Sequence, residues 1–230
     1  MLTLAIDTAG DRCAAALWQG GRGDGTLRAA RAVAMARGHG EALFAIVGDV
    51  FAEAGAEPRD ITRVVAVSGP STFTGLRIGL AAARGLALSL EVPALSVSAF
   101  VLVAAADEAS TGQKTPRLVA IDARRGEIYL CLLGPDLMPL AAPAVMTPRA
   151  GAERLAAGDV PLVGSGAELL AAAMRDLGRT AWTRPMPHPT AELLARIGAD
   201  LDPARHPPEP LYIRPPDAKE PAPALSGAVQ

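Results

Sequence analysis

The sequence is poor in cysteine, lysine and aromatic residues. Cysteine occurs only at Cys13 and Cys131, each inside an apolar run, which is typical of reduced thiols and argues against a disulfide-stabilised secreted scaffold. Lysine occurs only at Lys114 and Lys219. The net charge of −2 over 230 residues supplies no general positive field, so the bulk charge argues against a nucleic-acid clamp.

A leader pattern and long apolar segments are also lacking. The first residues, MLTLAIDTAGD, contain no basic stretch followed by an apolar core, so we expect no secretory signal. Half of the residues are hydrophobic, but runs such as Ala94–Ala106 are too short or too interrupted to cross a bilayer. We therefore expect a cytoplasmic protein with a well-buried core and no membrane contact.

What is present is a regular succession of strands and helices. Short β-branched and apolar runs predict strands, and apolar residues at helical spacing predict helices. In the first part of the chain the expected strands are Leu2–Ile6, Cys13–Trp18, Thr26–Ala34, Val64–Val67 and Ala94–Val97, and the expected helices are Gly38–Gly55, Thr74–Leu90 and Ser98–Asp107. This order predicts an antiparallel meander followed by parallel crossovers.

After the polar segment Asp107–Pro116 the pattern partly restarts. The expected strands there are Arg117–Asp122, Glu127–Leu133 and Pro161–Val163, and the expected helices are Pro148–Ala157, Ala167–Leu177 and Thr190–Asp200. The sequence thus predicts an N-terminal half over residues 1–107, a smaller half over 108–214 and a flexible tail rich in proline and alanine over 215–230. The expected fold class is α/β, the duplicated ribonuclease-H-like architecture of actin, Hsp70 and the sugar kinases, with a reduced second half.

Two helices have unusually bare outer faces. The helix from about Thr74 to Leu90 is apolar on nearly every side, with charge only at Arg77 and Arg84. In the helix Gly38–Gly55 the residues expected to face the core are Leu43, Phe44, Ile46, Val47, Val50, Phe51 and Ala54, and those expected to face outward are Glu41, Ala45, Gly48, Asp49 and Ala52. An ordinary surface helix shows one charged face to water. Both helices are therefore expected to pack closely against a further helix or another protein.

The turn Gly69–Gly75 is a candidate anion site. A strand, a glycine-rich turn and a helix N-terminus direct several backbone N–H groups to one place, near Ser71, Thr72 and Thr74. The spacing is not that of a Walker loop, and no lysine follows the last glycine. The alternative, which we favour, is a simple helix cap in which Thr72 or Thr74 bonds the free N–H groups.

Carboxylates end the first strand of each half, Asp7 and Asp122. Actin-like folds place such groups facing a nucleotide, but a strand-end aspartate also commonly caps its own turn. Neither alternative is preferred by the sequence.

Metal binding and nucleophilic catalysis find little support. The histidines, His39, His188 and His206, form no pair at helical spacing and stand beside no cysteine cluster, and a lone His39 between glycines is typical of a surface or cap residue. Ser68-Gly69-Pro70 is not a nucleophile elbow. We expect no metal site and no catalytic residue.

Two motifs carry a family resemblance. The segment Ser68–Gly79 resembles the GPGSFTGLRIG signature of the bacterial TsaB (YeaZ) family, with Ser71 where that family usually has glycine. The segment Ile121–Tyr129, IDARRGEIY, resembles a second motif of the family. Supporting matches occur at Ala5–Thr8, Gly38-His39, Val163–Gly166 and Pro210–Arg214, so the resemblance extends to about Arg214.

The resemblance implies an actin-like fold without its own active site. Members of this family are non-catalytic subunits that bind and activate a paralogous catalytic subunit, TsaD, which transfers threonylcarbamoyl to the adenosine beside the tRNA anticodon; an ATPase, TsaE, joins them. TsaD carries a metal-binding HxxxH pair. Here that helix opens with His39-Gly40-Glu41-Ala42-Leu43, so the second histidine is absent.

The resemblance also implies where partners bind. The first two helices would pair with those of the partner, through Glu41, Ala45, Gly48, Asp49 and Ala52 and through Gly75, Leu76, Gly79, Leu80, Ala83 and Leu86. A homodimer is expected in isolation, ATP or ADP could lodge at the joint interface, and tRNA would be reached only through the complex. The alternative is an independent ATP-dependent kinase or ATPase that uses Asp7, Asp122 and the Gly69–Gly75 turn.

Overall fold

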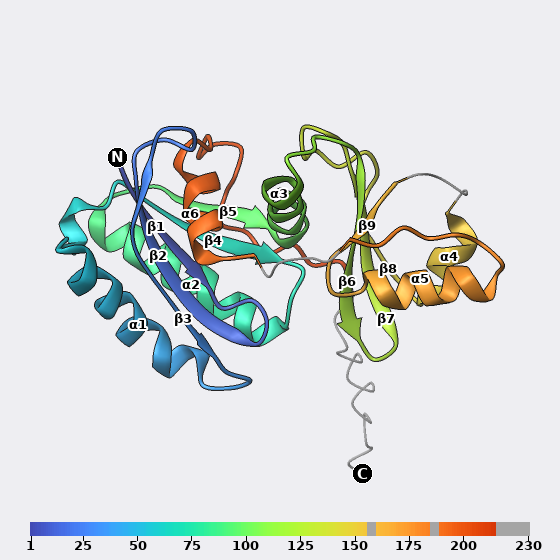
Figure 1. The fold of residues 1–230 in the computed structure, drawn as a ribbon. Helices are drawn as coiled ribbons and strands as arrows, with labels where there is room; N and C mark the ends of the chain where they lie inside the picture. Colours follow the sequence, from blue (N-terminus) through green and yellow to red (C-terminus); the bar gives the residue numbers. More distant parts are fainter. Residues whose placement is uncertain (156–159, 185–188, 215–230) are drawn as a thin grey trace, which may run out of the picture.

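The computed structural model describes residues 1–155, 160–184 and 189–214. Figure 1 shows two β-sheets side by side, each carrying helices, with one helix between them. The predicted tail over 215–230 and the predicted end of the helix Pro148–Ala157 lie outside the described residues.

The first sheet has the strand order β3-β2-β1-β4-β5. Its strands are β1 (Leu2–Asp7), β2 (Arg12–Gln19), β3 (Thr26–Ala34), β4 (Arg63–Gly69) and β5 (Ala94–Ser98). β1, β2 and β3 form an antiparallel meander, whereas β4 lies parallel to β1 and β5 parallel to β4. The central strand β1 is buried along its whole length, as expected for a strand covered on both faces.

Helices cover both faces of this sheet. On one face lie α1 (His39–Ala54) and α2 (Phe73–Leu90), and their apolar stripes pack on Leu4, Ile6 and other residues of the sheet (Figure 1). On the other face lie α3 (Ala99–Thr111) and α6 (Ala191–Ala199). Because successive side chains of a strand point to opposite faces, the sheet supports two separate apolar cores.

The second sheet repeats the first in shortened form. Its order is β8-β7-β6-β9, with β6 (Arg117–Arg124), β7 (Glu127–Leu133), β8 (Ala144–Met146) and β9 (Leu162–Val163). The β8, β7 and β6 strands are antiparallel and β9 is parallel to β6, as in the first four positions of the first sheet. The helices α4 (Pro148–Arg154) and α5 (Ala167–Asp176) cover one face. The duplicated α/β fold with a reduced second half is therefore confirmed.

Four features differ from the sequence prediction. The strand β8 and the short 3-10 helix Pro58–Asp60 were not predicted. The helix α6 was placed in the second half, but it packs on β1 and β2 of the first sheet, so the chain returns to complete the N-terminal half. Phe44 was predicted in the core, yet its side chain is 58% exposed on the outer face of α1.

The helix α2 is, among the described residues, the one helix long and apolar enough to cross a membrane by length and composition. Its inner stripe packs on the first sheet, and Arg77 and Arg84 are exposed. A helix that covers a sheet in this way meets the same test as a membrane span, so we interpret α2 as part of the globular fold.

Candidate functional site

The outer face of α1 is open and bare, as predicted. Every residue assigned to it is exposed: Glu41, Ala45, Gly48, Asp49 and Ala52. Phe44 adds an exposed ring, and a Cβ built at Gly48 meets no described atom within 4 Å. Of the two acids, Asp49 is paired with Arg31 of β3 at 3.6 Å. The face therefore offers small and aromatic side chains to a partner.

The inner stripe of α2 is not available to a partner, and this part of the predicted interface is corrected. Gly75, Leu76, Gly79, Leu80 and Ala83 are buried against the chain's own first sheet. The close contact for which the two glycines are needed is with Thr8 in the turn after β1. A Cβ would lie 2.3 Å from the Thr8 carbonyl oxygen if built at Gly75, and 2.5 Å from the Thr8 hydroxyl if built at Gly79.

A different stripe of α2 faces outward. Ala81, Arg84, Gly85 and Leu88 are exposed, and Leu88 is the most exposed large hydrophobic residue described, at 83%. Leu86, predicted at the interface, is half-buried beside this stripe. At its other end α2 meets α1, where a Cβ at Gly40 would lie 3.8 Å from Ile78 Cδ1. We call the exposed faces of α1 and α2 together the helix-pair surface.

The glycine-rich turn before α2 is built without a side-chain cap. Thr72 is the N-cap residue in an extended conformation, but its hydroxyl makes no capping hydrogen bond to any described residue. The preferred interpretation was a helix cap by Thr72 or Thr74, and for Thr72 it is wrong. The exposed Thr74 hydroxyl likewise makes no hydrogen bond to a described residue, so it caps nothing there. Gly69 has φ 98°, a conformation that favours glycine. Ser71 is not in the left-handed region, so the backbone at this position accepts serine in place of glycine without strain.

Both strand-end aspartates cap their own turns. Asp7 Oδ1 accepts the Ala9 N–H at 2.9 Å, and Asp122 Oδ1 accepts the Arg124 N–H at 2.8 Å. Each carboxylate also pairs with an arginine that follows it in the chain. Asp7 Oδ2 is 3.7 Å from Arg12 Nη2, and Asp122 Oδ2 is 3.5 Å from Arg124 Nη1. Both carboxylates are therefore already engaged by neighbouring groups of their own turns.

Burial dominates the electrostatics of Asp7. Desolvation raises the pKa of this carboxyl, and the Ala9 N–H and the positive charge of Arg12 offset only part of that effect. A raised pKa means that the folded state holds the proton more tightly than the unfolded state, so the ionised form at neutral pH opposes folding.

We predict that Asp7→Asn unfolds at a higher temperature than the wild type at pH 7. The amide retains the oxygen that accepts the Ala9 N–H but carries no charge to desolvate. In the wild type, a proton on Asp7 stabilises the fold below the unfolded pKa, and this stabilisation is lost as pH rises through the raised folded pKa. Asp7→Asn does not lose it, so its advantage over the wild type is largest at neutral pH and shrinks toward pH 4. Thermal unfolding from pH 4 to 8 measures it, with the exposed Asp11→Asn as control. A wild type more stable than Asp7→Asn at pH 7 contradicts this.

His39, expected to be a surface or cap residue, is instead buried in the first position of α1, after the N-cap Gly38. Its ring is at the start of α1, and Nε2 has no hydrogen-bond partner among the described residues. Leu43, at the position of the second histidine of the HxxxH pattern, is a fully buried core residue. In residues 1–155, 160–184 and 189–214 no three metal-ligating side chains gather, and His188 lies outside them.

The cysteines are also poor nucleophiles. Desolvation by burial raises the pKa of Cys13 and of Cys131 to about 11, so both are thiols at neutral pH. Each thiol belongs to a hydrophobic core, and the negative charge of Asp7 adds to the effect at Cys13.

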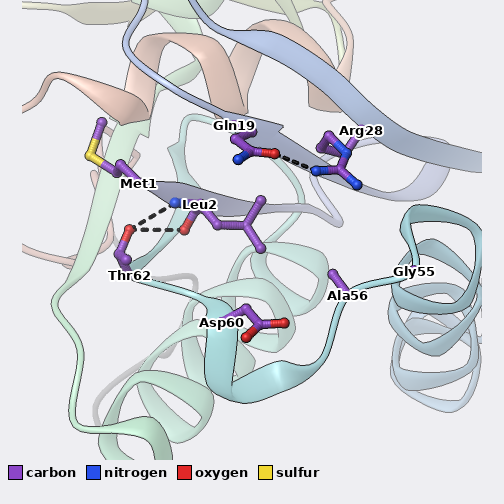
Figure 2. Close-up of a pocket in the computed structure, with 8 residues that line it drawn as sticks. All are labelled: Met1, Leu2, Gln19, Arg28, Gly55, Ala56, Asp60 and Thr62. Atoms are coloured by element: carbon purple, nitrogen blue, oxygen red, sulfur yellow. Dashed lines mark hydrogen bonds between the residues drawn. The ribbon is translucent and has the colours of Figure 1, made fainter.

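A shallow polar cavity of about 270 Å³ opens beside the start of β1 and the ends of β2 and α1 (Figure 2). It is lined by Met1, Leu2, Gln19, Arg28, Gly55, Ala56, Asp60 and Thr62. Arg28 binds the Gln19 side chain and the Ala54 carbonyl at the end of α1, and Thr62 bonds the Leu2 backbone. Arg28 thus joins β3 to β2 and to the end of α1, and Thr62 joins the chain before β4 to β1, so these polar groups of the cavity wall are used in holding the fold together. The cavity lies at the opposite end of β1 from Asp7.

A sequence model of the family described as TsaD, tRNA N6-adenosine threonylcarbamoyltransferase, matches residues 33–155, which is more than half of the chain. The chain belongs to the TsaD family. The matched region runs from α1 to α4 and so includes both helices of the helix-pair surface and the β6–β7 hairpin.

Individual relatives within the family resemble the chain over different lengths. It is 40% identical over 129 residues to the Escherichia coli tRNA threonylcarbamoyladenosine biosynthesis protein TsaB, which is 56% of this chain but only about half, 53%, of that relative. It is 33% identical over 219 residues to an uncharacterized Mycobacterium tuberculosis protein, covering 94% and 93% of the two chains. The solved structure of a Pseudomonas aeruginosa protein with similarity to peptidase YeaZ aligns with TM-score 0.71 and 25% identity over 93% of this chain and 99% of that one. The TsaB resemblance and the actin-like fold are thereby confirmed.

Proposed function

We propose that this TsaD-family chain acts in tRNA threonylcarbamoyladenosine biosynthesis as a non-catalytic subunit that binds and activates a TsaD-type catalytic subunit. The observation that carries the proposal is the helix-pair surface. It displays exposed Phe44 and Leu88 beside Ala45, Gly48 and Gly85, with fewer long charged side chains than an ordinary surface helix; among the residues assigned to these faces, Glu41 and Arg84 are the long charged ones. Small residues allow a partner helix to approach closely, and the two large apolar side chains supply area to bury.

The aspartates, the cysteines and Leu43 are all consistent with the proposed non-catalytic role. Asp7 and Asp122 cap their own turns, Leu43 replaces the second histidine of the metal pair, and both cysteines are protonated. The proposal is therefore that the catalytic groups come from the partner, that a TsaE-type ATPase joins the complex in the cytoplasm, and that ATP or ADP lodges at the joint interface. In the absence of its partner the same surface would bind a second copy of the chain.

We predict that Gly48→Arg and Gly85→Arg each weaken binding to the TsaD-type subunit by about a hundredfold or more. Both positions are open in the folded chain, since no described atom lies within 4 Å of a Cβ built there, so the variants should fold. At a closely packed interface an unpaired guanidinium has to be desolvated, which costs about 2–5 kcal/mol. Isothermal titration calorimetry measures the affinity, and light scattering measures whether the homodimer becomes monomeric.

The matched control is Leu169→Arg, which puts the same charge on the partly exposed α5 of the second half. It should bind as the wild type does. If the two glycine variants bind the partner with unchanged affinity, the helix-pair surface is not the interface. Turnover of Mg–ATP by the isolated chain would instead support the alternative of an independent ATPase.

A further inference from the structure

Two exposed aromatic rings stand together near the glycine-rich turn. Aromatic residues make up only 3% of the chain, yet Phe73 at the start of α2 and Tyr212 near the end of the described chain lie with ring centroids 5.9 Å apart. Their exposed fractions are 55% and 51%, so about half of each residue is open to solvent. No local sequence pattern indicates this pairing, because it joins residues far apart in the chain.

Arg77 stacks on the Phe73 ring, beside the ring pair, and its terminal amines are unsatisfied within the described part of the chain. Its guanidinium carbon lies 3.6 Å from the Phe73 ring centroid, and Nε donates a hydrogen bond to the Tyr212 hydroxyl at 3.0 Å. Its two terminal amines have no acceptor among the described residues. The stacking and the Nε bond thus orient a planar fork of N–H donors that suits a phosphate.

Further arginines lie in the segment after Tyr212 and in the β6–β7 hairpin that this segment contacts. The segment that carries Tyr212 continues to Arg214, whose guanidinium bonds the Ala123 carbonyl at 3.2 Å in the β6–β7 hairpin. At the tip of that hairpin Arg124 has φ 59° and Arg125 φ 55°, in the left-handed region that favours glycine or asparagine, and the Arg124 side chain is 80% exposed. Asp122 is paired with Arg124, and Glu127 is paired with Arg214.

We propose that Phe73, Arg77 and Tyr212 bind an unpaired nucleotide of a single-stranded RNA segment. A base stacks on an exposed ring, and the Arg77 fork binds the adjacent phosphate. Exposed rings beside a guanidinium plane are the usual means of holding unstacked bases. Phe, Tyr and Arg also occur at protein interfaces, but the flanking Thr72 and Thr74 are exposed and polar, which limits the apolar area that a protein could bury here.

This inference goes beyond the proposed function, under which RNA reaches the chain only through the catalytic subunit. It can therefore fail or succeed independently. The test uses the full isolated chain and a fluorescein-labelled ten-nucleotide single-stranded RNA, with anisotropy as the readout at low and moderate salt. Binding of the TsaD-type subunit by the same preparation, measured separately, reports on the proposed function alone.

We expect saturable binding that is about tenfold weaker in Phe73→Leu and in Tyr212→Leu, in line with the stacking contribution of one ring. Arg77→Gln should weaken binding and also reduce its salt dependence, because one phosphate contact is lost. Tyr212→Phe keeps the ring and should bind within about threefold of the wild type. The control Trp182→Leu removes another half-exposed ring, one that Arg184 stacks on at 4.7 Å, and should leave binding unchanged.

Further probes separate the ligands. Duplex RNA should compete at least tenfold more weakly than the single strand, since its bases are already stacked. The proposal is overturned if the wild type does not bind the single strand, if both ring variants bind as the wild type does, or if AMP competes as well as the oligonucleotide, which would assign the site to free nucleotides. It is likewise overturned if the two ring variants lose affinity for the TsaD-type subunit while RNA binding is retained, which would assign the rings to a protein interface.

Discussion

Gly75→Ala is expected to destabilise the fold by about 3 kcal/mol, even though alanine is the better helix former. The added methyl would lie 2.3 Å from the Thr8 carbonyl oxygen, and that oxygen belongs to backbone that cannot rotate away. The same contact carries a hydrogen bond, donated by the Thr8 hydroxyl to the Gly75 carbonyl at 2.6 Å in a buried place. Moving the helix outward to accommodate the methyl would lengthen this bond and loosen the packing of Leu76 and Leu80.

Gly85→Ala on the same helix is the matched control. Its Cβ would meet no described atom within 4 Å, so only the gain in helix propensity remains, and stability should rise by about 0.5–1 kcal/mol. For a protein of this size these changes correspond to a fall of roughly 6–12 °C in Tm for Gly75→Ala and a rise of roughly 1–4 °C for Gly85→Ala. Thermal unfolding followed by circular dichroism measures both. Equal stability of the two variants would show that α2 does not sit against Thr8.

The contrast between these glycines shows what a small-residue stripe can and cannot predict. The sequence indicates that something approaches α2 closely at Gly75 and Gly79, and this is confirmed, but it does not indicate what. Only the tertiary arrangement shows that the turn after β1 occupies the groove. On α1 the same reasoning placed Gly48 and Ala52 correctly on the outside, because the opposite stripe of large apolar residues fixed which face is buried.

The fold was predicted well where local patterns decide it. The strand β3 has the expected bounds Thr26–Ala34, and the restart of the pattern at Arg117 corresponds to a second sheet with the same strand order. Prediction failed where a long-range contact decides the outcome. Nothing local shows that α6 returns to the first sheet, or that Phe44, which lies at the margin of its apolar arc, points to solvent.

The candidate site follows the same division. The motifs around Ser68–Gly79 and Ile121–Tyr129 were recognised from the sequence, since they are contiguous. The group of Phe73, Arg77 and Tyr212 was not, because its third member comes from a proline-rich segment with no periodic pattern. The two strand-end aspartates were correctly located, but only the observed hydrogen bonds show that they cap their turns.

A buried ionic cluster joins the two halves of the molecule. Asp107 near the end of α3 lies 2.9 Å from Arg184 Nη1 and 3.5 Å from Arg117 Nη1, and the Arg117 side chain has no exposed surface. The remaining N–H groups of Arg117 are bound by backbone carbonyls of Ala104, Gln113 and Thr115. One carboxylate thus balances two guanidinium groups that come from β6 and from the chain beyond β9, on the far side of α3 from the first sheet.

Asp107→Ala should therefore destabilise the protein by about 3–5 kcal/mol, because it leaves two buried cations without a counter-charge. The neighbouring Glu108→Ala removes a pair with Lys114 that is 3.9 Å apart and largely solvated on the lysine side, so its effect should be under about 1 kcal/mol. Urea unfolding gives both values. Hydrogen exchange should locate the damage in β6 and β9, where Arg117 and Arg184 are anchored, before it reaches β1 and β2. If Asp107→Ala were as stable as Glu108→Ala, the carboxylate would not be what holds α3 to the second sheet, and the carbonyl bonds of Arg117 alone would have to do so.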